Sequence, residues 1–224
     1  TTVASAGADL SLASNANKLQ NVTVKANNGS ASIVSGNDAG VALKVQTDGT
    51  VGGSLSIQST SDVVSEGTIS AAGDVTMTAG DKVIINSGTI NANSVTAKDT
   101  DLFVNGGTIN VGTLAASKGL NIASNSSNTT NITANNITAG GSIGITGGNV
   151  VTTSVAADEA LNITGGTVSS DGAVSLSGAT GVAIGSAATI NTGGDLALVA
   201  NGGGVTNNSE LNISGSVALS GKTD

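Results

Sequence analysis

Two pairs of neighbouring acidic residues are the first groups in this sequence that could do chemistry. Asp99 lies two residues before Asp101, and Asp158 is followed directly by Glu159. Paired carboxylates can bind calcium or divide general acid and base roles between them. Asp is also common at turns, because its side chain hydrogen-bonds the local backbone. Since no repeated Gly-Gly-X-Gly-X-Asp pattern indicates a calcium β-roll, we interpret both pairs as solvated turn residues and expect no metal site.

Several other residue types that often carry catalysis are missing. The 224 residues include no His, Cys, Trp or Tyr and a single Phe. Polysaccharide lyases and hydrolases built on stacked strands are similar to one another in using Arg, His, clustered Asp and aromatic platforms, and this chain lacks that set. We therefore predict a protein that is not an enzyme and holds no cofactor. With so few aromatic rings on which sugars could stack, direct carbohydrate binding is also not expected.

The charge balance narrows the range of partners. The formal net charge is −8, and the seven basic residues are all Lys. Nucleic acid is not expected as a partner, because phosphate binding needs a clustered basic surface and usually bidentate Arg. Membrane insertion is not expected either, since no run of about 18 apolar residues is present.

A series of threonines precedes a recurrent apolar residue. Its members are Thr50, Thr68, Thr89, Thr108, Thr167 and Thr189, with Asn131 and Asn149 in two further repeats. Ordered hydroxyl ranks could bind ice or a crystalline polysaccharide, but that needs a flat lattice, and the intervals between repeats vary from 18 to 23 residues. We interpret the series as structural, with side chains that stack along a rod.

The apolar residues repeat at a mean spacing of 20 residues, in three series that keep phase with one another. The first, the anchor series, comprises Val51, Ile69, Ile90, Ile109, Ile132, Val150, Val168, Ile190 and Leu211. The second comprises Leu55, Val75, Val95, Leu114, Ile137, Val155, Val174, Leu196 and Val217. The third consists of alternating pairs: Val83 and Ile85, Leu102 and Val104, Leu120 and Ile122, Ile143 and Ile145, Leu161 and Ile163, Val182 and Ile184.

Strict alternation within each segment predicts short strands with one buried face. Asn-Gly, Gly-Gly and Asp-Gly pairs between the segments are typical of tight turns. Three short strands and their turns use about 20 residues, which makes one coil of a parallel β-helix. We predict an all-β β-solenoid in which Ile109, Leu114 and Leu120 point inward in one coil. Residues 1–48 are expected to form less regular coils, and residues 49–224 one continuous regular solenoid.

The coil from Gly67 to Ala79 and the segment from Gly172 to Ser177 resemble the haemagglutinin-type repeats of filamentous adhesins exported by two-partner secretion. The resemblance covers about residues 49–220 and implies a right-handed parallel β-helix, a handedness that the prevalence of right-handed crossovers also favours. It implies an extracellular or cell-surface location and the role of a long shaft. The Asn-Pro motifs typical of the secretion domain of that family are missing because the chain has no Pro, so the resemblance is to the shaft alone.

Two functions are therefore open: a structural and adhesive shaft, or a subunit that polymerises end to end into a filament or sheath. A β-helix enzyme acting on polysaccharide is a third and weaker alternative. The expected partners are the chain itself or identical subunits at the ends of the solenoid, and a host surface or matrix for an adhesin.

Period-two alternation also predicts a lateral contact patch. If the third-series pairs face inward, the residues between them face outward. Val64, Ile84 and Phe103 would then form an exposed apolar stripe on three consecutive coils, followed by Asn121 and Gly144. Such a stripe could contact another chain or could be a covered corner.

Overall fold

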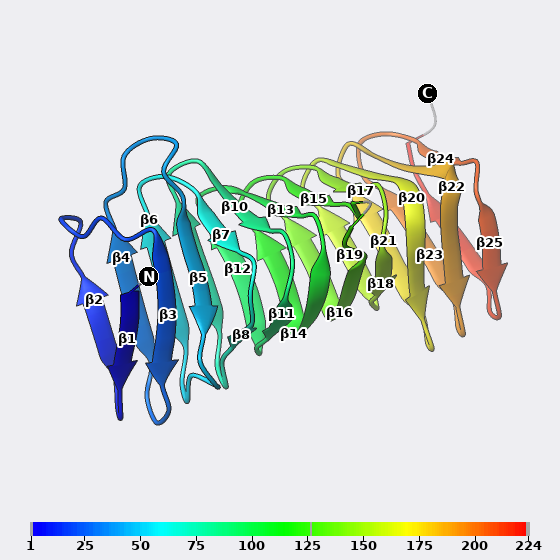
Figure 1. Cartoon of the computed structure of the whole chain (residues 1–224). Coiled ribbons are helices and arrows are strands. Elements are labelled where there is room, and N and C mark those ends of the chain that lie inside the picture. The colour runs from blue at the N-terminus through cyan, green and yellow to red at the C-terminus, as the bar shows by residue number, and fades with distance from the viewer. Residues whose placement is uncertain (1, 126, 223–224) are drawn as a thin grey trace.

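The chain folds into an elongated stack of β-coils that runs from the N-terminus at one end to the C-terminus at the other (Figure 1). This computed structural model describes residues 2–125 and 127–222. Thr1, in the predicted region 1–48, and Ser126, Thr223 and Asp224, in the predicted region 49–224, lie outside the described residues. Within those residues all regular structure is β, in 26 strands that pair parallel, and no helix is long and apolar enough to cross a membrane. The solenoid has about 10 turns spaced about 21 residues apart, which confirms the predicted fold.

Three ladders of stacked strands form the sides of the solenoid. The first contains β8 (Ile69–Ser70), β11 (Thr89–Asn91), the first parts of β14 (Gly107–Ala116) and β16 (Thr130–Ala139), β18 (Asn149–Val151), the last parts of β20 (Ala160–Ser170) and β22 (Gly181–Thr192), and β25 (Glu210–Ile213).

The second ladder contains β2 (Leu10–Ala13), β4 (Ala31–Ser35), β6 (Leu55–Ser59), β9 (Val75–Ala79), β12 (Ser94–Lys98), the last parts of β14 and β16, β19 (Ser154–Ala157), β21 (Val174–Gly178), β23 (Leu196–Ala200) and β26 (Val217–Ser220). The third contains β1 (Thr2–Ala6), β3 (Asn21–Ala26), β5 (Leu43–Thr47), β7 (Val63–Ser65), β10 (Lys82–Ile85), β13 (Asp101–Val104), β15 (Leu120–Ile122), β17 (Ile143–Ile145), the first parts of β20 and β22, and β24 (Val205–Asn207).

Alternation along the strands places the aliphatic residues inside. In β9, Val75 and Met77 are fully buried while the two threonines between and after them are only half-buried. Ile109 and Leu114 are fully buried and Leu120 is 2% exposed, so the predicted inward positions in this coil are confirmed. All pairs of the third apolar series are buried and stack in register from coil to coil.

Two residues of the predicted series stack differently from the expectation. Val51 is opposite Ala71, and the backbone N–H of Thr47 donates to the Thr68 carbonyl at 2.7 Å, which places Thr47 next to Ile69. Val155 is opposite Leu176, whereas Val174 stacks on Leu196. In both cases the pairing is shifted by two residues along the strand, so the same face of the strand stays buried.

The N-terminal coils continue the solenoid without a break, since β3 pairs with β5 and β5 with β7. Their interior contains a buried side-chain amide. Asn37 is 5% exposed, its amide nitrogen donates to the Leu19 carbonyl at 2.6 Å, and its Oδ1 accepts from the Ser35 hydroxyl at 2.7 Å. Buried polar groups are tolerated when they are hydrogen-bonded in this way.

Glycines with positive φ form the corner that precedes the first ladder. Gly88 has φ 87° and Gly107 has φ 94°, and a Cβ on Gly107 would lie 2.6 Å from the Gly88 carbonyl oxygen. Gly148 and Gly166 occupy the same corner in later coils, with φ 94° and 80°. This close approach of successive backbones explains why residues without a side chain recur there.

Candidate functional site

The outer face of the first ladder carries the predicted threonine series as a stacked column. Thr89 lies opposite Thr108, and Thr167 opposite Thr189. Asn131 and Asn149 continue the column between them, and Thr68 extends it by one coil, because Ile69 is opposite Ile90.

Thr50 does not belong to this column, which corrects the expectation. Because Val51 is opposite Ala71, Thr50 lies beside Ser70, and the two hydroxyl oxygens are 3.0 Å apart. The Asp48-Gly49 pair, with φ 81° at Gly49, adds residues to the turn and shifts the chain. Spacing along the sequence could not show where these extra residues are accommodated.

A second, mainly polar column runs beside the first and was not predicted from the sequence. It consists of the residues two positions after the members of the first column, which are Ser70, Asn91, Asn110, Thr133, Val151, Ser169 and Asn191, and it continues to Asn212, two positions after Glu210. Val151 is the one apolar member. Several amides donate to the amide oxygen of the neighbouring coil, as Asn110 does to Asn91 at 2.9 Å and Asn212 to Asn191 at 2.9 Å. Asn, Ser or Thr follows seven of the nine anchor residues directly, all except Val51 and Val150, and this recurrence is the signal that could have revealed the column.

The two columns remain in register although the repeat length varies. The additional residues of longer repeats lie in the turns. The varying repeat length therefore does not disturb the outer face of the first ladder, although the spacing suggested that it would. The asparagine side chains hydrogen-bond along the rod, and these bonds stabilise neighbouring coils. In the first column Asn149 donates to Asn131 at 3.1 Å, and the threonines lie in register with one another. That the threonines are structural stays a prediction.

The third ladder arranges the predicted contact patch in the expected order. Val64 is opposite Ile84, Ile84 opposite Phe103, and Phe103 opposite Asn121. Ile84 and Phe103 are half-buried on the outer face. Val64, however, is only 6% exposed, so its predicted exposure is wrong.

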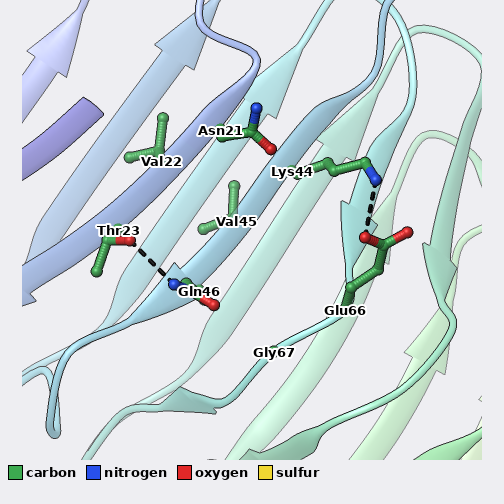
Figure 2. A pocket seen from close by; sticks show the side chains of 8 residues that line it. All are labelled: Asn21, Val22, Thr23, Lys44, Val45, Gln46, Glu66 and Gly67. Atoms are coloured by element: carbon green, nitrogen blue, oxygen red, sulfur yellow. Dashed lines mark hydrogen bonds and ion pairs between the residues drawn. The ribbon is translucent and has the colours of Figure 1, made fainter. Parts of the chain in front are cut away.

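Charged neighbours explain the burial of Val64. Lys44 lies opposite Val64 on the preceding coil, and Glu66 follows Val64 by two residues on the same outer side. The Lys44 ammonium and the Glu66 carboxylate are 2.8 Å apart, and Figure 2 shows the two side chains reaching toward each other along the outer face. The aliphatic stem of a lysine covers apolar surface while its ammonium stays in water. The exposed part of the stripe is therefore the pair Ile84 and Phe103.

The acidic pairs have local structural roles. The Asp101 Oδ1 accepts the Gly119 N–H at 2.7 Å, and the Glu159 carboxylate accepts from the Ser142 hydroxyl at 2.9 Å. Asp99 has φ 64°, a left-handed turn conformation that Asp tolerates better than most residues. Residues 2–125 and 127–222 contain no group of three acidic, Cys or His side chains that could hold a metal ion.

No protein-family model, curated protein or solved structure matches this chain.

Proposed function

We propose that this chain is a non-catalytic shaft segment of a secreted or cell-surface filamentous adhesin. The observation that carries the proposal is the unbroken parallel stacking from β1 to β26, in which each internal coil pairs with the coil before it and the coil after it. Such a solenoid is quasi-one-dimensional, so its length grows with the number of coils and its stability is shared along the stack. A rod of about ten coils spaced about 4.8 Å apart extends roughly 50 Å, which suits a spacer.

The surface chemistry supports the same proposal. The outer columns of the first ladder carry Thr, Asn and Ser from Thr68 to Asn191, with the single exception of the exposed Val151, and they contain no charged residue. The four ion pairs found among the described residues join exposed or half-exposed groups. Surface ion pairs of this kind contribute at most about 1 kcal/mol each. The rod is thus held by backbone ladders and aliphatic stacking, a construction that suits an extracellular protein without disulfides.

Removal and duplication of one coil test the shaft proposal. Thr167 is opposite Thr189, so deletion of residues 167–188 joins Gly166 to Thr189 and leaves equivalent stacking positions on both sides of the junction. We expect the deleted and duplicated chains to remain folded and to differ in length by about 4.8 Å per coil in small-angle X-ray scattering. Beads coated with either chain should attach to host cells or matrix as well as the parent chain does.

Two results would contradict the proposal. Unfolding of both length variants would mean that the coils are not interchangeable spacers. Failure of beads coated with the parent chain to attach to any cell or matrix surface would remove the adhesive part of the proposal.

A self-assembling filament or sheath subunit is the second candidate. The observation that favours it is an uncovered terminal coil: Val217 is 46% and Leu219 67% exposed, while their register partners Leu196 and Leu198 are fully buried. Another coil stacked on β26 would bury these side chains. That coil would belong either to the same chain or to an identical subunit.

A further inference from the structure

A cavity of about 320 Å³ lies on the outer face of the third ladder, beside the only aromatic residue of the chain. Phe103, Asn121, Gly144 and Asn162 follow one another in register across four coils and line it. With coils about 4.8 Å apart, this row extends about 14 Å from Phe103 to Asn162.

Gly144 is the residue that opens the cavity. It has no side chain, so the row has a gap between the two asparagines. A Cβ built on Gly144 would meet only the Asn121 amide nitrogen, at 3.5 Å, and its φ is not in the left-handed region. Neither strain nor a tight backbone approach therefore requires glycine here, unlike at Gly107.

The polar groups around the gap are of the kinds that recognise hydroxyl groups. Each Asn amide can donate and accept hydrogen bonds at the same time. Among the described residues, the Asn121 and Asn162 amides make no hydrogen bond to another protein group, so both are available to a ligand. Asp101 and Ser142 complete the rim, and the Gly119 N–H and the Glu159 carboxylate hold their side chains in place.

The lining also indicates which ligands do not fit. It contains the Asp101 carboxylate and no lysine, so an anionic ligand would be repelled. Its polar rim and open side offer little enclosure for a lipid chain. Phe103 provides an apolar surface next to amides and a hydroxyl, which matches a ligand with one apolar face and a ring of hydroxyl groups.

We propose that this cavity binds a neutral disaccharide unit of a glycan, in which one hexose lies with its C–H face against Phe103 and the next occupies the gap at Gly144, with hydroxyl groups on Asn121 and Asn162. This site goes beyond the shaft function, since a spacer needs no cavity. The scarcity of aromatic residues suggested that the chain would not bind sugars. One ring is sufficient if it lies at the edge of a polar cavity, and the fold places it there.

The experiment is a screen of the 224-residue chain against an immobilised panel of neutral, sialylated and sulfated glycans, followed by calorimetric titration of the best neutral oligosaccharide. We expect weak binding, with a dissociation constant on the order of 1 mM or somewhat tighter, because few groups contact the ligand. Phe103→Ala should weaken binding at least about tenfold, and Gly144→Gln should abolish it by filling the gap. Ala156→Gln is the matched control, because Ala156 lies on the outer face of the second ladder in the coil that follows Gly144, opposite Thr138.

Circular dichroism and thermal melting check that each variant is folded. If Phe103→Ala is unfolded, the comparison of Gly144→Gln with Ala156→Gln still decides the test. Binding that is lost in Gly144→Gln and kept in Ala156→Gln supports the site. Retention of acidic glycans alone, no retention of any glycan, or binding by Phe103→Ala and Gly144→Gln as tight as that of the parent chain overturns it. None of these results bears on the length variants that test the shaft function, so the two proposals fail separately.

Discussion

Ile109 provides the most direct test of the interior at the scale of single residues. It is fully buried between Ile90 and Ile132, which stack on it in register and are themselves at most 1% exposed. Ile109→Asp would bury a carboxylate without a partner, and we expect a loss of several kcal/mol of unfolding free energy in urea denaturation. Thr108→Asp, which changes the adjacent half-exposed residue, should shift stability by no more than about 0.5 kcal/mol. Equal midpoints for the two variants would show that Ile109 does not face the core.

Whether a side chain faces in or out was predictable at this scale, because alternation in Val75-Thr76-Met77 determines it without knowledge of the fold. Exposure was less predictable. Val64 faces outward yet is buried, because Lys44 from another coil and Glu66 cover it. The buried Asn37 was also beyond prediction, since its partners Leu19 and Ser35 come from different parts of the chain.

At the scale of elements, the glycines at the corner before the first ladder provide a test of how closely successive coils approach. Gly107→Ala combines a positive φ of 94° with a Cβ placed 2.6 Å from the Gly88 carbonyl oxygen. We expect destabilisation of about 1–3 kcal/mol, measured as a lower melting temperature. Gly172→Ala is the control, because a Cβ there has nothing within 4 Å and the φ is ordinary. It should be neutral or stabilising by up to about 1 kcal/mol. Similar melting temperatures for the two variants would indicate that the corner does not need glycine.

The three series of strands follow from the apolar spacing, and their pairing is mostly as the spacing predicts. Thr50 shows where this reasoning fails, because two repeats of similar length can differ in where a turn absorbs extra residues. The order Phe103, Asn121 and Gly144 on the outer face of the third ladder was predictable from the alternation, and the register confirms it and adds Asn162. The cavity beside this row was not predictable, because its shape depends on how side chains from neighbouring coils pack.

At the scale of the whole molecule, the uncovered coil makes association between chains testable. The inward-facing Leu219 is 67% exposed, whereas Leu198, its neighbour on β23, is fully buried, and the free edge of β26 also offers backbone groups to another strand. We expect the 224-residue chain to form end-on oligomers that increase with concentration in analytical ultracentrifugation. Leu219→Lys should reduce them by placing a charge on the coil face. Ala218→Lys, which changes the outward residue next to it, should not. Monomers alone at every concentration, for a chain with intact termini, would contradict the filament candidate, because a subunit that polymerises by stacking must bury this coil against its neighbour.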